Sequence, residues 1–195
     1  MPRVVDVEER RRELGEAVWR VVRRDGLAEA SVRTVAREAG LSTGSLRHYF
    51  STQTDLLVFA MRLVVGRVQE RVAAAHRPPD VREAAVAVLG ELLPLDAERR
   101  AENEVWLAFT ARALVQPELR ELREEAYTAL WDGCLQWVRR LLPADAAAED
   151  VELEAHRLFA LVDGLAVHAA VNPRHATPER LVEVLRRHLD GVGRP

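Results

Sequence analysis

The sequence predicts an all-α protein, and three observations support this fold class. Apolar residues recur at helical spacing along the chain, as at Leu14, Ala17, Val18, Val21 and Val22. Long runs of strict apolar and polar alternation, which would predict strands, are absent. Glycine and proline residues separate the apolar stripes and therefore mark helix ends. At 195 residues, the chain is long enough to bury a core and to divide into a small module and a larger body.

Capping residues and helix breakers predict about nine helices in sequence order. Three short helices come first. A long fourth helix, which opens with a capping box at Thr52 and Asp55, is long enough to join two domains. The helices are expected at about residues 14–25, 32–39, 43–49, 52–76, 80–93, 96–115, 117–142, 150–171 and 177–190.

The composition is typical of a globular chain and excludes several classes of protein. Apolar residues make up 48% and charged residues 30% of the chain. Cys134 is the only cysteine, so no disulfide framework is expected, and a reducing cytoplasm is the expected location. The N-terminus lacks a signal-peptide core, and no long uncharged apolar stretch predicts a membrane span. The formal net charge of −3 does not by itself suggest a nucleic-acid partner.

Two short helices separated by Gly40-Leu41-Ser42 fit a helix-turn-helix. Small residues at Ala36 and Ala39 allow the two helices to approach closely, and Gly40 permits the positive φ that the turn requires. The exposed side chains expected on the second helix are hydrogen-bonding groups and a planar ring, which suit base edges and phosphates. These residues are Thr43, Ser45, Arg47, His48 and Tyr49. A helical hairpin with a polar face and no DNA partner is the alternative.

The segment TVAREAGLSTGSLRHYF at residues 34–50, followed by Leu56-Leu57, resembles the N-terminal domain of the TetR family of transcriptional regulators. Gly26 and Ser31-Val32 stand at the spacing usual in that family. The resemblance implies a helix-turn-helix DNA-binding domain at residues 1–52 and a helical effector-binding and dimerisation domain at residues 53–195. It further implies a homodimer on a palindromic operator in double-stranded DNA, most often a repressor that a small-molecule effector releases.

The resemblance also implies roles for residues of the first domain. Ser31, Arg33 and Thr34 would touch phosphates or a base edge. Arg47 is expected to read guanine through its O6 and N7 atoms, with a phosphate contact as the alternative. Gln53 replaces a lysine that usually contacts phosphate, so binding is expected to be weaker or less sensitive to salt. The remaining residues expected at the DNA surface are Ser42, Thr43, Gly44, Ser45, His48 and Tyr49.

In the body, the segment LVDGLAVH at residues 161–168 and the closing residues 185–190 resemble the BetI-like branch of the family. In the family the last two helices usually form the dimer interface, although their apolar faces could instead pack only within the subunit. The expected interface residues are Leu158, Val162, Leu165, Ala166, Ala169, Leu181, Val184, Leu185 and Leu189.

An effector cavity is expected among the fourth to eighth helices, where aromatic residues and polar side chains occur on apolar faces. Its expected lining is Trp106, Phe109, Thr110, Arg112, Trp131, Cys134, Trp137, His156, Phe159, Asp163 and His168. Each of these residues could instead be ordinary core. The three tryptophans would suit an aromatic or cationic molecule.

Catalysis, a lost DNA-binding function and activation of transcription are the alternatives to this hypothesis. The sequence has no HExxH pair, phosphate-binding glycine loop or nucleophile elbow, so no catalysis, metal or cofactor is expected. A cysteine in an apolar mid-helix position, such as Cys134, is usually inert. A helical interaction protein that has lost DNA binding, and an activator of the same family, are the remaining alternatives.

Overall fold

The computed structural model describes residues 7–193, and within them it contains α-helices, two short 3-10 segments and no strand, which confirms the all-α prediction. The helices are α1 (Val7–Asp25), α2 (Val32–Glu38), α3 (Thr43–Arg47), α4 (Gln53–Ala74), α5 (Val81–Gly90), α6 (Ala97–Ala113), α7 (Arg120–Leu141), α8 (Ala148–Val171) and α9 (Pro178–Gly191). The 3-10 segments are η1 (Leu27–Glu29) and η2 (Pro117–Leu119). No helix in the described part of the chain is long and apolar enough to cross a membrane.

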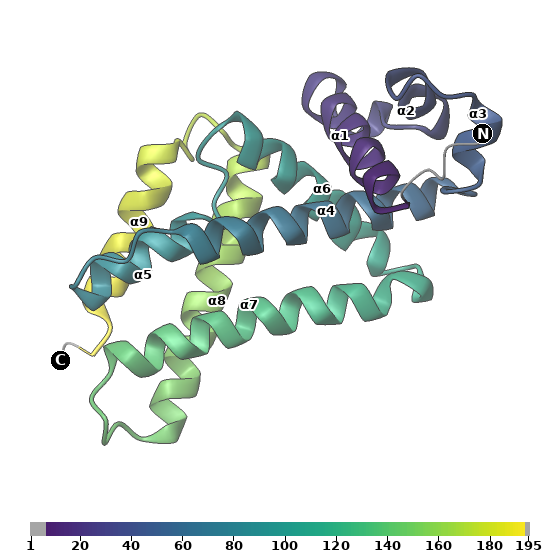
Figure 1. Ribbon diagram of the computed structural model, residues 1–195. Helices are drawn as coiled ribbons and strands as arrows, with labels where there is room; N and C mark the ends of the chain where they lie inside the picture. Colours follow the sequence, from purple (N-terminus) through teal and green to yellow (C-terminus); the bar gives the residue numbers. More distant parts are fainter. Residues whose placement is uncertain (1–6, 194–195) are drawn as a thin grey trace.

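The first three helices form a small unit, here called the head, at one end of the long helix α4 (Figure 1). The remaining helices, α4 to α9, form the body. Within the body α6 packs on α4, α8 packs on α7, and α9 packs on α5. Because α4 begins beside the head and continues into the body, it is the element that joins the two units.

The buried apolar side chains form two clusters. The first contains residues of α1, α2 and α3 together with residues of α4 and α6, among them Val18, Leu46, Leu57 and Phe109. The second lies at the far end of the body, between α5, α7, α8 and α9. Since the first cluster continues past residue 52, the head shares part of its core with the body.

Several helices end earlier than expected because i→i−3 hydrogen bonds replace the helical pattern in their last turn. Tyr49 N donates to Leu46 O at 2.9 Å, so α3 ends at Arg47. Three such bonds follow one another after α5 ends at Gly90. Pro117 opens the separate segment η2 instead of the first turn of α7.

A polar cluster ties the head to the body. Trp19 of α1 is buried, and its Nε1 donates to the Glu98 carboxylate of α6 at 3.3 Å. The Arg67 guanidinium of α4 lies 4.4 Å from the centre of the Trp19 ring and also donates to Glu98. A guanidinium over an indole face makes a favourable cation–π contact. These three residues, here called the Trp19 clasp, link α1, α4 and α6.

A second ion pair follows one helical turn further along the same two helices. Arg71 of α4 donates to both carboxylate oxygens of Glu102 of α6, at 2.7 and 2.5 Å. Glu102 is only 3% exposed, and Arg71 also lies 3.3 Å from the Glu91 carboxylate. Arg67 and Arg71 are four residues apart on α4, and Glu98 and Glu102 are four residues apart on α6. The two ion pairs therefore lie on one face between α4 and α6. This face is called the α4–α6 seam below.

Candidate functional site

The helix-turn-helix is built from hydrogen-bonded caps. Ser31 and Thr34 form a capping box at the start of α2, in which Thr34 N donates to Ser31 Oγ at 3.1 Å and Ser31 N donates to Thr34 Oγ1 at 2.8 Å. At the other end of α2, Leu41 N donates to Ala36 O at 2.9 Å across Gly40, whose φ is 66°. This is the bond pattern of a helix closed by a glycine in the left-handed conformation. The caps therefore fix the angle between α2 and α3.

Helix α3 is held by one buried side chain and presents the others to solvent. Ser42 caps it by accepting from Ser45 N at 3.0 Å, and Leu46 is fully buried against the head. Tyr49, just beyond the helix, is 43% exposed. The exposed residues on this surface are Thr43, Gly44, Ser45, Arg47, His48 and Tyr49. The structure thus brings these predicted DNA-contacting residues together on one face of the head.

The other predicted DNA-contacting residues differ in how free their side chains are. Arg33 and Arg47 are exposed, and no described residue forms a hydrogen bond or ion pair with either guanidinium. The hydroxyl groups of Ser31, Thr34 and Ser42 are already engaged in the helix caps. The two free arginines are therefore the groups best placed to meet phosphates or a base edge.

Gln53 has a role that the sequence did not suggest. Its Nε2 donates to Ala30 O at 2.6 Å, across a separation of 23 residues. This bond ties the first residue of α4 to the segment that leads into α2. The side chain thus fixes the entry of the connecting helix into the head.

An ion-pair cluster holds α2 against α1. The Glu38 carboxylate accepts from Arg20 Nε at 2.7 Å and from an Arg24 terminal nitrogen at 2.9 Å. Hydrogen bonds from Arg20 and then Arg24 lower the pKa of Glu38, since both favour the charged carboxylate. The cluster orients α2, and with it α3, relative to the helix that carries the Trp19 clasp.

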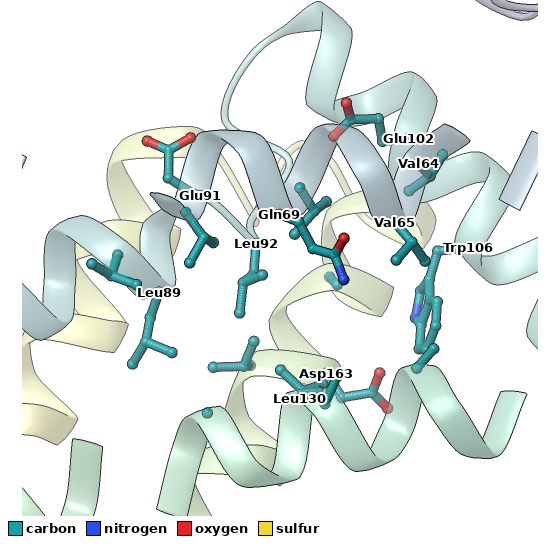
Figure 2. Close-up of a pocket in the computed structure, with 18 of the residues that line it drawn as sticks. Val64, Val65, Gln69, Leu89, Glu91, Leu92, Glu102, Trp106, Leu130 and Asp163 are labelled. Carbon is teal, nitrogen blue, oxygen red and sulfur yellow. The ribbon is translucent and has the colours of Figure 1, made fainter. Parts of the chain in front are cut away.

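The body contains a cavity of about 450 Å³ lined by residues of α4 to α8 and of the α4–α5 connection. This volume lies within the range of roughly 300–1,000 Å³ typical of small-molecule sites. Most of the wall is apolar, and α4 supplies much of it through Met61, Val64, Val65, Val68 and Val72. Figure 2 shows Val65 and Gln69 on α4 facing the space above α7 and α8. The helix that enters the head is therefore also a wall of the cavity.

Most of the charged groups in the cavity wall already have partners. Glu102 is paired with Arg71, and Glu91 lies 3.2 Å from Arg99. The exposed Arg77 donates to the carbonyl groups of Val72, Ala75 and Ala73 at the end of α4. The exposed Arg140 lies over the Trp137 ring at 4.4 Å.

Asp163 of α8 is the exception among the acidic residues of the wall. No arginine or histidine of the described side chains forms an ion pair with it. Burial raises the pKa of the Asp163 carboxyl, and hydrogen bonding from Trp106 only partly opposes this shift. Tyr127 stacks near Trp106, with ring centroids 5.1 Å apart, and burial followed by the Asp163 charge raises the pKa of that phenol. The wall thus holds a partly buried carboxyl group beside aromatic rings.

The cavity includes part of the predicted effector set. Three residues of this set, Trp106, Trp137 and Asp163, line the cavity. Gln136 of α7 lies in the wall as well. The other eight predicted residues lie outside its wall. Phe109 and Cys134 are core side chains, Thr110, Trp131 and Phe159 are partly buried, and Arg112, His156 and His168 are exposed.

Burial raises the pKa of the Cys134 thiol to about 12, which fits the inert thiol expected for this residue. The sequence did not predict two parts of the cavity wall, namely the side chains of α4 and the consecutive α6 residues Glu102 and Asn103. Two polar residues in the middle of α6 were a usable signal for the second part. Asn103 Nδ2 donates to Ala166 O at 2.8 Å and so holds α6 against α8.

The expected dimer-interface residues require a correction. Six of them are buried within the subunit because α8 and α9 use their strongest apolar stripes to pack on each other and on α5 and α7: Leu158, Val162, Ala166, Leu181, Leu185 and Leu189. Only Leu165, Ala169 and Val184 are partly exposed. The exposed large apolar side chains of α8 are instead Leu153, Val167 and Val171.

Together, these features define a helix-turn-helix DNA-binding protein with a cavity in a helical body. Family models give the same result: residues 16–58 match "Bacterial regulatory proteins, tetR family" and residues 60–194 match "BetI-type transcriptional repressor, C-terminal". The chain belongs to the TetR family of transcriptional regulators, and its body is of the BetI type. These matches are to regulators and not to enzymes.

Individual relatives agree over nearly the whole chain. The HTH-type transcriptional regulator PksA of Bacillus subtilis is 39% identical over 195 residues, which cover 98% of this chain and 94% of the relative. BetI of Vibrio parahaemolyticus is 29% identical, with 97% and 95% covered. Among solved structures, a transcriptional regulator from Saccharomonospora viridis in complex with choline has a TM-score of 0.80 at 27% identity, with 94% and 97% covered. A regulator from Rhodococcus sp. Rha1 has a TM-score of 0.78 at 33% identity, with 93% and 95% covered.

Proposed function

We propose that this protein is a homodimeric repressor that binds a palindromic operator and is released when a small molecule occupies the cavity of its body. The observation that carries this proposal is the double position of α4, which forms a wall of the cavity and enters the head beside the helix-turn-helix. A ligand in the cavity would touch the same helix that positions the DNA-contacting surface.

DNA recognition would rest on α3 and the start of α2. The exposed guanidinium of Arg47 would enter the major groove, where it can bridge O6 and N7 of guanine. Arg33 would bind phosphate, and the small residues Gly44 and Ser45 would allow the backbone to approach the duplex. Since Gln53 is uncharged and bonded to Ala30, the phosphate contact of the usual lysine would be absent and the salt dependence correspondingly reduced.

Two copies of the chain would meet through the outer face of α8. Along this face, residues at spacings of four, three and four are apolar or small and lie at or near the surface, namely Ala160, Gly164, Val167 and Val171, and Leu153 lies two turns before the first of them. Small residues in the middle of such a stripe let two helices approach closely. A two-fold axis there would place two heads on adjacent half-sites of a palindrome.

Release requires the ligand to favour one head position over another, because a ligand that binds both states equally shifts nothing. The α4–α6 seam and the Trp19 clasp are the contacts that a displacement of α4 would rearrange. They are polar and directional, so a shift of α4 along α6 would exchange or break them. The relative from Saccharomonospora viridis solved with choline supports a small organic molecule as the effector.

The test of DNA recognition is retention of sheared genomic DNA by the purified protein at near-physiological salt, followed by sequencing of the bound fragments. One enriched near-palindrome is expected, and Arg47→Ala should abolish the enrichment without changing the unfolding curve. Arg139→Ala, which removes an exposed arginine of α7, is the matched control and should retain enrichment. A folded dimer that enriches no sequence, even after ligand is stripped by refolding, would instead indicate an interaction protein that has lost DNA binding.

The dimer face has its own test by light scattering on a sizing column. Val167→Glu should give monomers, because it places a charge in the proposed apolar interface. Val115→Glu is the matched control on an exposed valine outside α8 and should stay dimeric. A dimeric Val167→Glu protein would move the interface elsewhere. Transcription in vitro from a template that carries the enriched operator would separate a repressor from an activator.

A further inference from the structure

We infer that the cavity binds an amphipathic organic amine, with its ammonium group at Asp163 beside Trp106 and its apolar part along the α4 wall. This inference deepens the proposed function, on which it rests, by naming the chemical class of the effector.

The charges of the cavity wall favour a cationic ligand. Among the acidic residues of the cavity wall, Glu91 and Glu102 have arginine partners, whereas Asp163 has none within the described residues. The wall's own arginines do not compensate for this. Arg99 is paired with Glu91, and the exposed Arg77 and Arg140 are occupied by α4 carbonyl groups and by the Trp137 ring. A cation is therefore the ligand group that would relieve the cost of holding the Asp163 charge in a partly buried site.

The aromatic rings near the Asp163 carboxylate also favour a cation. The Trp106 indole, which favours the charged form of Asp163, has its ring centroid 5.1 Å from that of Tyr127, and the Tyr127 centroid lies 5.9 Å from that of Phe159. Faces of indole and phenol rings attract a neighbouring cation. Figure 2 shows Trp106 and Asp163 close together at one end of the cavity. A positive group seated there would meet both a carboxylate and the electron-rich ring of the lining Trp106.

The free hydrogen-bond acceptors of the cavity favour amines over quaternary ammonium ions. A carboxylate has about four lone-pair sites, and the single N–H group of the Trp106 indole can occupy only one of those on Asp163. On the opposite wall the Gln69 amide of α4 extends into the same space, as Figure 2 shows, and none of the described residues forms a hydrogen bond with it. These free acceptors favour a ligand that donates N–H groups, which a quaternary ammonium ion lacks.

The size and the lining of the cavity favour an amphipathic ligand. At about 450 Å³ the cavity is of the size that encloses drug-sized molecules rather than a compact ion. Away from Asp163 most of the wall is apolar, and its valine and leucine side chains include Val68, Val72, Leu89, Leu92 and Leu130. Burying a hydrocarbon chain or ring against these residues is favourable in proportion to the area removed from water. The ligand is therefore amphipathic, with a polar end at Asp163.

The experiment compares two probes of matched length by titration calorimetry on the full chain: phenylbutylamine, which is protonated at neutral pH, and uncharged phenylbutanol. The wild-type protein should bind the amine about tenfold or more tightly than the alcohol. Asp163→Asn should abolish this preference, while Asp132→Asn, the same change at an exposed position of α7 outside the wall, should keep it. Choline, a compact quaternary ion, should bind more weakly than the amine.

Equal binding of amine and alcohol, no binding of the amine, tighter binding of choline, or an unchanged preference in Asp163→Asn would each overturn the inference. A second measurement does not depend on the probe: without ligand, Asp163→Asn should unfold at the same or a higher denaturant concentration than the wild type. A clear loss of stability would identify Asp163 as a structural partner and also refute the inference. Enrichment of operator DNA is measured without any probe, so failure there overturns the proposed repressor while leaving the amine preference a separate result.

Discussion

The Arg71–Glu102 pair of the α4–α6 seam predicts that replacing its two partners lowers the free energy of unfolding by unequal amounts. Glu102 is 3% exposed, whereas the Arg71 side chain is 27% exposed and has a second carboxylate, Glu91, at 3.3 Å. Arg71→Met therefore leaves a buried charge without a partner, and breaking a buried pair in this way costs about 3–5 kcal/mol. Glu102→Gln leaves a cation that still reaches Glu91 and water, so its cost should be nearer 1–2 kcal/mol.

The assay is urea unfolding followed by circular dichroism, at one protein concentration because dimer formation would shift the apparent stability. The double variant Arg71→Met with Glu102→Gln completes a mutant cycle and should cost less than the sum of the single changes. A larger loss for Glu102→Gln than for Arg71→Met, or losses below about 1 kcal/mol for both, would refute the claim that the buried carboxylate dominates this seam.

Three further predictions concern single positions. Because the pKa of Asp163 is raised in the native state, the native state binds more protons than the unfolded state. The free energy of unfolding should therefore fall as pH rises from the ordinary pKa of 3.8 through the raised pKa. Asp163→Asn should remove that fall in a pH series of unfolding curves. Gly40→Ala should cost about 1–2 kcal/mol by backbone strain alone, since φ is 66° and the added Cβ would meet no atom within 4 Å. Gly44→Ala, the control within α3, should be neutral or stabilising, and equal costs for the two changes would refute this prediction. Phe109→Ala, at a fully buried position, should cost about 3–5 kcal/mol in the same assay, and a loss below 1 kcal/mol would show that the site collapses around the smaller side chain.

The sequence was most informative where a residue's role is local. Thr52 and Asp55 were predicted as a capping box from their position before an apolar stripe, and in the structure the Thr52 side chain accepts a hydrogen bond from Asp55 N. Capping depends on three or four consecutive residues, so its signal lies entirely in the sequence. The same holds for Gly40, whose turn geometry depends on its own lack of a side chain.

Features that depend on contacts between distant segments were harder to predict. The apolar stripes of α8 and α9 are real, but periodicity does not say whether a stripe faces its own subunit or a partner, and most of it faces inward. The cavity wall on α4 looked like any other buried helix face. Gln53 was read as a lost charge, although its amide is bonded to Ala30, 23 residues away. In each case the deciding fact is a tertiary neighbour that no local pattern encodes.

The Trp19 clasp also gives the protein an optical reporter at its domain junction. Trp19 is the only tryptophan of the head, since the other three are Trp106, Trp131 and Trp137. Its indole is buried between a guanidinium and a carboxylate, so its emission colour and quenching would change if α1 moved relative to α4 and α6. With the three body tryptophans replaced by phenylalanine, the remaining fluorescence would follow the seating of the head in real time and without an attached dye.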